Sequence, residues 1–309
     1  MRHYKHWIAL EQTKGIGPAQ LREIHDALSR LNLSITDLFE LDAREIQEEL
    51  SLSESKARLI AGAKDTLASV EQDYLDTLDA GVEIIPFFDG AYPARLSRLL
   101  GNTGPPFLRC LGNTRLLPEK GAAILGDKFI SEKGELITYL AAQELVRHRI
   151  TVISGFARGA DMIAHRAAIE SRGGTIALLP HGFAHLQVPQ AFQDVFNLDS
   201  MLLISPFSFK KEYSPYNAMQ RNRIICALSL AVYIVESPAE GGIFEAGKSA
   251  QGLGVPLYTT EYSSYPDTAA GNPRLISELG ANPVRGRIIN NVLTPNLDRL
   301  IGDVKFGRP

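Results

Sequence analysis

The fold is decided by the stretch Ile150-Thr-Val-Ile-Ser-Gly-Phe-Ala-Arg-Gly-Ala-Asp-Met-Ile-Ala-His-Arg166. It opens with β-branched residues, which is the composition of a buried parallel strand. Glycines then interrupt the strand, and the pattern predicts a helix over residues 160–171 and a second strand over residues 175–179. Strand, glycine-rich turn, helix and strand form a βαβ unit. Its turn lies outside the carboxyl ends of the strands, where open α/β sheets bind ligands.

The glycine turn is suited to an anion. Gly155 and Gly159 let the backbone approach a phosphate closely, and the start of the helix offers unpaired N–H groups and partial positive charge. Arg158 adds a guanidinium that can hold a phosphate with two hydrogen bonds. A tight strand-to-helix connection with a surface arginine explains the same residues equally well, because a short glycine turn is a weak motif.

Composition limits the class of protein. The 309 residues suffice for a large core and two domains, and 45% hydrophobic with 22% charged residues is ordinary for a soluble globular protein. No apolar run reaches the roughly 18 residues of a membrane span. Because Met1–His6 is not followed by an apolar signal core, we expect a cytoplasmic protein without a membrane partner.

Charge and cysteine content narrow the class further. The net charge of -3 excludes a uniformly basic nucleic-acid surface, so any nucleic-acid site must be a local patch. Cys110 and Cys226 have no metal-ligand spacing and are expected to be small buried residues in a reducing compartment. The histidines are scattered, so the sequence predicts neither a metal site nor a cofactor.

The N-terminal region is predicted to be helical throughout. Within it, Thr13–Arg22 resembles the Gly-x-Gly turn of a helix-hairpin-helix, whose backbone amides contact a nucleic-acid phosphate. Leu50–Ile60 resembles a second such half, or a helix capped by Ser51 or Ser53. A helical interaction module that does not touch DNA remains the alternative, because this region is not basic overall.

Strands that alternate with helices predict an α/β fold: a doubly wound, mostly parallel, Rossmann-like sheet. Ser131 is expected to cap a helix over residues 132–147, a further helix is expected to begin near Gln220, and Val255–Thr259 is the last clear strand. The predicted organisation is a helical domain over 1–78, a connector over 79–120, a Rossmann-like domain over 121–290 and a short tail over 291–309.

Cations outnumber carboxylates between Phe207 and Arg223. The cations are Lys210, Lys211, Arg221 and Arg223, and only Glu212 opposes them. If this loop folds over the strand ends, its cations lie beside Arg158 and Lys128, and Tyr213 and Tyr216 add rings suited to stacking bases. A solvated loop whose tyrosines pack locally is the alternative.

A second glycine turn, Gly241-Gly242, precedes another helix that carries Glu245 and Lys248. The turn suits an anion, but Glu245 would repel one, so that carboxylate either binds a ribose or acts as an acid–base group. A carboxylate favoured by the helix dipole is the alternative. Asp161 and His165 stand one helical turn apart and can pair, yet no serine or cysteine nucleophile lies in a triad setting, so a hydrolase is not predicted.

Several motifs together resemble the DNA-processing protein A (DprA/Smf) family. The run Ser154–Asp161 with His165 is similar to one family signature, and Arg221–Ile225 followed by Leu228-Ser229 is similar to a second. Shorter matching motifs flank them in chain order. They are Tyr92-Pro93, Pro105-Pro106 and Gly112-Asn113 upstream, and Asn272–Ile276 with Gly280-Ala281 downstream.

The resemblance implies a Rossmann-like domain behind a small helical domain, and a cytoplasmic, dimeric, non-enzymatic protein that uses no cofactor. It further implies that the protein binds single-stranded DNA, protects it and loads a RecA-type recombinase. Carried over, the expected DNA-contacting residues are Lys128, Arg158, Arg221 and Arg223, with Ser154, Gly155 and Gly159 shaping the pocket. Asn222, Gly241, Gly242 and Lys248 complete the predicted phosphate-binding set.

The chain departs from the family in three places. Gly126-Asp127-Lys128 stands where the family has Gly-Ser-Arg, which replaces a bidentate donor by a point charge. Glu240–Ala246 stands where the family tends to have Ser-Gly-Ser-Leu-Ile-Thr-Ala, and it is closer to the glycine–glutamate motif of the Lonely Guy phosphoribohydrolases. The C-terminal winged-helix domain of many members is not found before the chain stops. A nucleotide-binding sensor or phosphoribohydrolase-like enzyme in phage defence, with Glu245 as its catalytic group, is therefore the alternative function.

Overall fold

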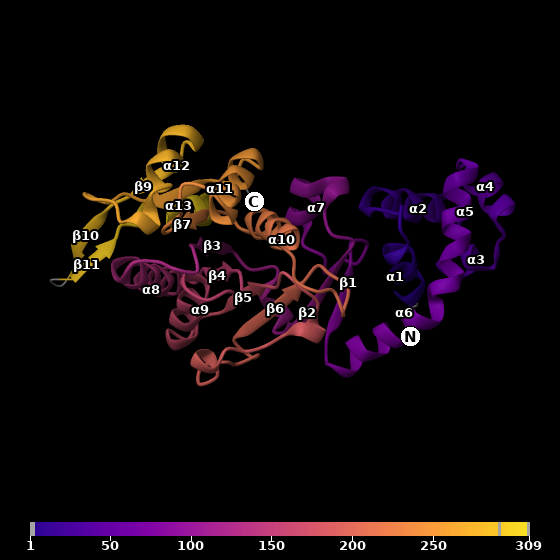
Figure 1. Ribbon diagram of the computed structural model, residues 1–309, viewed down its shortest axis with the longest axis horizontal. Helices are drawn as coiled ribbons and strands as arrows, with labels where there is room; N and C mark the ends of the chain where they lie inside the picture. The colour runs from indigo at the N-terminus through magenta and orange to yellow at the C-terminus, as the bar shows by residue number, and fades with distance from the viewer. Residues whose placement is uncertain (1–3, 290–291, 308–309) are drawn as a thin grey trace.

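The computed structural model describes residues 4–289 and 292–307. Its N-terminal part is all-helical, as predicted, and lies at one end of the molecule (Figure 1). Three of its helices begin at the side-chain caps Ser34, Asp42 and Ser53, which accept hydrogen bonds from backbone N–H groups. The helices are α1 (Tyr4–Gln12), α2 (Pro18–Leu31), α3 (Ile35–Glu40), α4 (Ala43–Leu50), α5 (Glu54–Gly62) and α6 (Leu67–Asp79).

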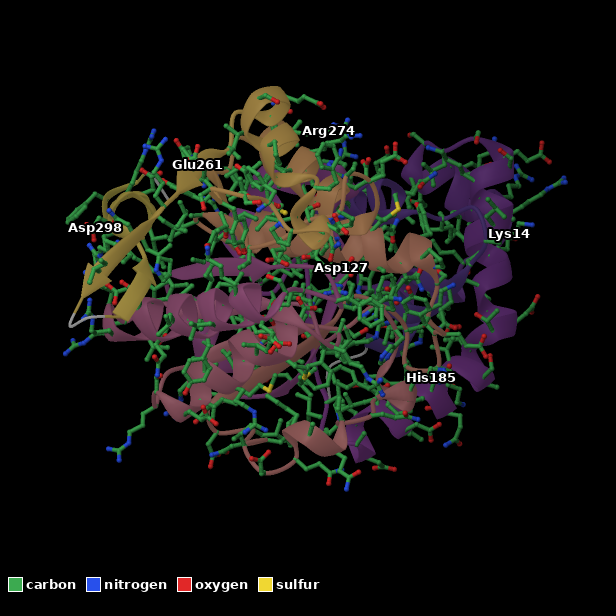
Figure 2. The ribbon with its side chains drawn as sticks, turned by 60° about the vertical axis from the view of Figure 1, so that its left-hand side comes forward. Lys14, Asp127, His185, Glu261, Arg274 and Asp298 are labelled. Atoms are coloured by element: carbon green, nitrogen blue, oxygen red, sulfur yellow. The ribbon has the colours of Figure 1, made fainter. Side chains whose placement is uncertain are left out.

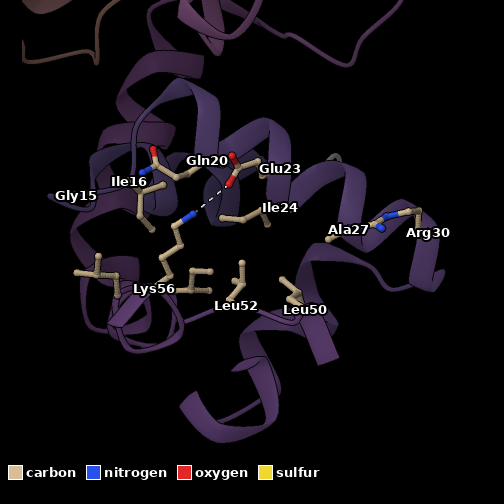
Figure 3. Close-up of a pocket in the computed structure, with 12 residues that line it drawn as sticks. Gly15, Ile16, Gln20, Glu23, Ile24, Ala27, Arg30, Leu50, Leu52 and Lys56 are labelled. Atoms are coloured by element: carbon tan, nitrogen blue, oxygen red, sulfur yellow. Dashed lines mark hydrogen bonds and ion pairs between the residues drawn. The ribbon is translucent and has the colours of Figure 1, made fainter. Parts of the chain in front are cut away.

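The predicted glycine hairpin joins α1 to α2. Gly15 has φ +98°, a conformation that favours glycine, and the Gly17 N–H donates to the Gln20 side chain at 2.8 Å. Ser53 caps α5, whereas Ser51 ends α4 in the left-handed region. Helices α2, α4 and α5 enclose a small, mainly apolar hollow, which the Lys56–Glu23 ion pair spans at 3.3 Å (Figure 3).

A nine-stranded sheet forms the second part, in the order β1-β2-β6-β5-β4-β3-β7-β8-β9. The strands from β6 to β9 in this order pair in parallel, and β2 pairs antiparallel with both β1 and β6. This is the predicted mostly parallel α/β fold. The strands are β1 (Glu83–Pro86), β2 (Phe107–Gly112), β3 (Gly121–Leu125), β4 (Thr151–Ser154), β5 (Thr175–Leu178), β6 (Met201–Ser205), β7 (Val232–Ile234), β8 (Leu257–Thr260) and β9 (Asn282–Val284).

Helices cover both faces of the sheet, because buried strands must hide apolar side chains on each side. Ala122 and Ile124 of β3 pack with one helical layer, and Ala123 and Leu125 pack with the other. The first layer holds α8 (Glu132–Arg147), α9 (Ala160–Glu170) and α13 (Asp298–Phe306). The second holds α7 (Ala94–Leu100), α10 (Pro215–Leu228), α11 (Gly242–Gly252) and α12 (Asn272–Leu279).

Several predicted boundaries differ from the structure. The segment predicted as a connector contributes β1 and β2 to the sheet, because their apolar residues extend its edge. Helix α10 begins at Pro215 rather than near Gln220, since the Ser214 side chain caps it and proline fits its first turn. Beyond β8 the chain adds β9, the hairpin of β10 (Gly286–Ile289) and β11 (Val292–Pro295), and α13.

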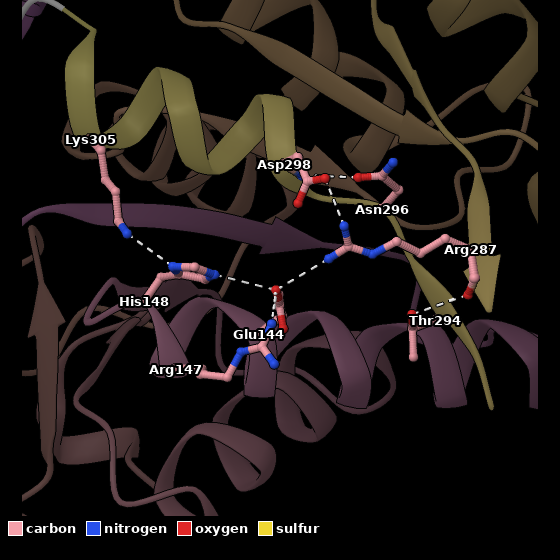
Figure 4. A network of polar contacts seen from close by, with 8 residues as sticks. All are labelled: Glu144, Arg147, His148, Arg287, Thr294, Asn296, Asp298 and Lys305. Carbon is pink, nitrogen blue, oxygen red and sulfur yellow. Dashed lines mark hydrogen bonds and ion pairs between the residues drawn. The ribbon is translucent and has the colours of Figure 1, made fainter. Parts of the chain in front are cut away.

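The C-terminal hairpin lies at the end of the molecule opposite the N-terminal helices (Figure 1). It is tied to the sheet domain by polar contacts (Figure 4). Arg287 of β10 contacts Asp298 at 2.6 Å and Glu144 of α8 at 3.5 Å, and Lys305 of α13 contacts His148 at 2.9 Å. Among the described residues, no helix is long and apolar enough to cross a membrane.

Candidate nucleic-acid interface

The loops that follow β3, β4 and β7 meet at the carboxyl edge of the sheet. The chain leaves β3 toward β4, β5 and β6 on one side and returns to β7 on the other, so the loops after β3 flank a topological switch point, where such sheets bind ligands. A cavity of about 160 Å³ lies there. It is lined by Leu125, Gly126, Asp127, Lys128, Ala157, Asp161, Arg221, Asn222, Gly242 and Ile243.

The turn after β4 has room only for glycine at its two predicted positions. A Cβ on Gly155 would lie 1.5 Å from the Arg221 guanidinium. Gly159 has φ +79°, and a Cβ there would lie 2.6 Å from the carbonyl oxygens of Asp127 and Lys128. The glycines therefore let the turn pack on the loop after β3 and on α10, which brings three segments to one cavity.

The Asp161 carboxylate holds this turn together. The buried Ser154 hydroxyl lies 2.6 Å from the Ile124 carbonyl oxygen and 2.9 Å from Asp161 Oδ1, and the Ala157 N–H donates to Asp161 Oδ2 at 3.2 Å. Asp161 Oδ2 also lies 3.7 Å from Arg221 Nη1. One carboxylate thus joins the end of β4, the turn and α10.

Helical spacing would let His165 pair with Asp161, but its ring nitrogens bond to other residues. Its Nε2 donates to the Gly155 carbonyl at 2.6 Å, and its Nδ1 lies 2.7 Å from the Thr175 hydroxyl. The ring is fully buried, and burial lowers the pKa of His165. Helical spacing brings Asp161 and His165 to one face, but the partners of His165 lie on other segments, at Gly155 just after β4 and at Thr175, which begins β5. Both residues shape the turn.

Arg221 and Asn222 line the cavity from α10. Arg221 is 7% exposed, its Nε has no hydrogen-bond partner among the described residues, and burial lowers its pKa while Asp161 opposes that shift. Asn222 donates from Nδ2 to the Gly242 carbonyl at 3.1 Å, which joins α10 to the second glycine turn. Gly241 in that turn has φ +113°. A buried guanidinium beside two helix N-termini favours an anion in this cavity.

The exposed cations are distributed over the edge. Lys128 is exposed at the cavity, whereas Arg158 and Gly159 line an adjoining groove of about 700 Å³ along α9, with Met162 and Phe192. Arg223 does not face the cavity. It lines a separate cleft of about 170 Å³ with Pro18 and Pro105, because residues two apart on a helix point in different directions.

Three charged residues that the sequence suggests for this edge pair away from the cavity: Lys248 of the predicted phosphate-binding set, Glu245 of the alternative function, and Lys210 of the loop before α10. Lys210 lies 2.6 Å from Asp73 and 3.4 Å from Asp76 on α6, so it joins the loop to the N-terminal part rather than to the strand ends. Glu245 and Lys248 pair with each other at 2.7 Å on α11, and neither lines the cavity. The first-turn position of Glu245 matches a carboxylate favoured by the helix dipole.

Two residues at this edge are absent from the sequence-based set. Phe129 is 70% exposed, and Lys128 Nζ lies 5.1 Å from its ring centroid. Glu236 is fully buried and accepts hydrogen bonds from the Ser131 N–H and hydroxyl at 2.8 and 2.6 Å, and from Tyr262 at 2.6 Å. The position of Phe129 among turn residues could have indicated an exposed aromatic ring. Nothing in the sequence distinguishes the buried Glu236 from the surface glutamates.

No metal centre is found at this edge or elsewhere in the described part of the chain: no three His, Cys, Asp or Glu side chains are grouped to hold an ion. The open parallel sheet with its cavity at the switch point places the protein in the class of Rossmann-like α/β proteins. A model of the family described as DNA recombination-mediator protein A matches residues 83–293. The match spans more than half of the chain, so the chain belongs to this family, and the resemblance predicted from its motifs is confirmed.

Curated relatives carry names from the same family. Protein Smf of Synechocystis is 25% identical over 318 residues, which cover 96% of this chain and 77% of the relative. Protein Smf of Escherichia coli is 30% identical over 169 residues, covering 54% of this chain and 45% of the relative. DNA processing protein DprA of Bacillus subtilis is 25% identical over 208 residues, covering 67% and 69%.

Solved structures share the fold. DNA processing protein A from Streptococcus pneumoniae superposes with a TM-score of 0.75 at 21% identity, over 92% of this chain and 95% of that one. The Helicobacter pylori protein superposes with a TM-score of 0.56 at 23% identity, over 65% and 90%, and its structure was described for its single-stranded DNA binding mode. At these identities, the likeness shows the α/β architecture.

Proposed function

We propose that this chain binds single-stranded DNA along the carboxyl edge of its sheet, protects it and hands it to a RecA-type recombinase in transformation or recombination. The observation that carries the proposal is the anion-suited cavity at the switch point. The exposed Lys128 lies at this cavity, the exposed Arg158 lies on the neighbouring groove, and the buried Arg221 lies in the cavity wall. The relatives named for DNA processing support the same function.

The exposed aromatic rings and cations at this edge suit single-stranded DNA rather than duplex DNA. Tyr213 precedes α10 and Tyr216 lies in its first turn; they are 61% and 66% exposed, and α10 also carries Arg221. Exposed rings near cations stack unpaired bases and neutralise phosphates without reading sequence. Binding should therefore weaken steeply as salt rises, because each neutralised phosphate releases counterions.

The first test is fluorescence anisotropy with a labelled oligo-dT at low and high salt. Arg158→Ala should lower affinity by about tenfold for every sequence alike, because a charge-assisted phosphate contact is lost. The variant should fold normally, since Arg158 is exposed. Arg115→Ala is the matched control: Arg115 is also exposed but follows β2 at the opposite edge of the sheet.

Either of two results would move the interface. Unchanged affinity in Arg158→Ala would remove that residue from the DNA site. A loss of affinity confined to Arg115→Ala would place the DNA strand at the amino edge of the sheet.

The same two variants test delivery to a RecA-type recombinase. In filament assembly on a DNA strand coated with this protein, Arg158→Ala should slow assembly and Arg115→Ala should not. A homodimer is part of the proposal, and light scattering gives the mass that checks it.

We infer that the protein acts by binding rather than by catalysis. In support, Glu245, the candidate acid–base group of the nucleotide-hydrolysing alternative, pairs with Lys248 and is not among the residues that line the cavity. Incubation with a panel of nucleoside monophosphates should release no free base. Base release that Glu245→Gln abolishes would reverse this inference.

A further inference from the structure

The loop between β3 and α8, residues 126–131, presents an exposed aromatic ring beside the anion cavity. Phe129 is 70% exposed, although its loop neighbours Gly126, Asp127 and Lys128 line the cavity wall. Asp127 marks this loop in Figure 2. Burial of a large apolar side chain is favourable, so a ring left in water next to residues that line the cavity is available to a ligand.

The backbone that carries this ring is held at several points. The Phe129 N–H donates to Asp127 Oδ1 at 3.0 Å, and the Ser131 N–H donates to the buried Glu236 carboxylate at 2.8 Å. The Asp127 and Lys128 carbonyls pack against Gly159, which has no Cβ to push them away. The ring is therefore displayed on a fixed loop, and little backbone entropy is lost when a ligand covers it.

The surroundings of Phe129 indicate the chemistry of that ligand. Lys128 Nζ lies 5.1 Å from the ring centroid, so a cation accompanies one face of the ring. The next cations along the edge are Arg158 and the buried Arg221. A ligand that places a flat apolar face on the ring and a negative group beside these cations combines both features, and an unpaired nucleotide of a DNA strand is such a ligand.

We propose that Phe129 is a nucleobase-stacking site, which takes one unpaired base while Lys128 and its neighbours hold the adjacent phosphates. The inference rests on the proposed DNA-binding function and adds a base-contacting residue to it. Stacking accepts every base, since each has a π-face, so the site adds affinity without sequence preference.

Phe129→Ala should weaken oligo-dT binding by about tenfold, within the range measured for single stacked bases, whereas Phe129→Tyr should keep most of the affinity. An abasic strand of the same length isolates the phosphate contribution and should bind wild type and Phe129→Ala alike. Phe306→Ala is the matched control, because Phe306 is 87% exposed at the end of α13, away from this edge. Its affinity should not change.

A second readout detects the stacking itself. The only native tryptophan, Trp7, is buried in the N-terminal part, so Phe129→Trp introduces an exposed fluorophore at the site. Oligo-dT should quench its emission, and the abasic strand should not. Phe306→Trp should respond to neither strand.

The outcomes separate this inference from the proposed function. If Phe129→Ala binds oligo-dT as tightly as wild type while Arg158→Ala does not, the stacking site is wrong and DNA binding stands. Equal losses on oligo-dT and on the abasic strand would make Phe129 a loop-shaping residue and overturn the stacking site. If wild type binds no strand at low salt, both proposals fall together.

Discussion

At the scale of single residues, the contacts of the glycine turn show what spacing along a chain reveals and what it does not. The types of residue suited to an anion are visible in the sequence, and Gly155 and Gly159 are where close approach requires them. The partners are not visible. His165 donates to the Gly155 carbonyl at 2.6 Å rather than pairing with Asp161, although the two residues stand one helical turn apart.

The contribution of the tight glycine turn to the free energy of unfolding can be measured by replacing Gly159. Gly159→Ala should lower the free energy of unfolding by about 1–3 kcal/mol, because φ +79° is unfavourable for an L-residue and its Cβ would press on two carbonyl oxygens. Urea denaturation checks this value. Gly159→Ala should also bind oligo-dT more weakly, because its Cβ would displace the loop 126–131, which carries Lys128.

Gly302→Ala is the control for that substitution. Gly302 lies inside α13 without a positive φ, and a Cβ added there would meet no atom within 4 Å. Alanine should therefore stabilise the helix by about 0.5–1 kcal/mol. Equal effects of the two substitutions would mean that the tight packing at Gly159 does not constrain the turn.

At the scale of elements, local patterns predict what a segment forms better than where it lies. Helix α8 has the predicted bounds Glu132–Arg147, and Ser131 caps it, because both cap and periodicity are local signals. The antiparallel placement of β1 and β2 at the sheet edge depends on pairing with β6, which is far along the chain. No local pattern carries that information.

The predictions for the start of α10 and for the position of Lys210 differ from the structure for other reasons. Ser214-Pro215 is a local start signal, but the prolines of the loop suggested continued irregular structure. The sequence predicts Lys210 beside the other cations of this edge only if its loop folds over the strand ends. It pairs instead with Asp73 and Asp76, because the loop folds against α6 of the N-terminal part. Charge content predicts a cationic segment, while its direction depends on the tertiary fold.

At the scale of the whole molecule, the helical part and the sheet are joined by a buried ion pair. Arg109 of β2 is 2% exposed, and its Nη1 and Nη2 lie 3.3 and 2.6 Å from the two carboxylate oxygens of Glu11 on α1. Arg22 adds a contact over the Phe87 ring at 4.6 Å. Because β2 belongs to the same sheet as the strands beside the cavity, this junction fixes the N-terminal helices relative to the proposed DNA interface.

The buried Glu11–Arg109 ion pair should contribute to the stability of this junction. Glu11→Gln should lower the free energy of unfolding by about 3 kcal/mol, because it leaves the buried Arg109 charge uncompensated. Combining it with Arg109→Met should recover most of the loss, since an apolar side chain of similar length fills the site without a charge. Urea denaturation of the two single variants and the double variant gives the coupling. Lys210→Met, which removes the contacts of an exposed lysine with Asp73 and Asp76, is the control and should change stability little.

If the double variant is no more stable than Glu11→Gln, the loss does not come from an unpaired buried charge, and the junction depends on hydrogen bonds that methionine cannot replace. Measuring oligo-dT affinity separates a local effect at this junction from a change in how the N-terminal helices and the sheet are arranged. Arg109 lies on β2, and β6, β5 and β4 separate it from the cavity beside β3, so oligo-dT affinity should persist in every variant that remains folded. A folded double variant with weakened DNA binding would instead show that the N-terminal helices contribute to the interface, which the helix-hairpin-helix resemblance of Thr13–Arg22 raises as an alternative.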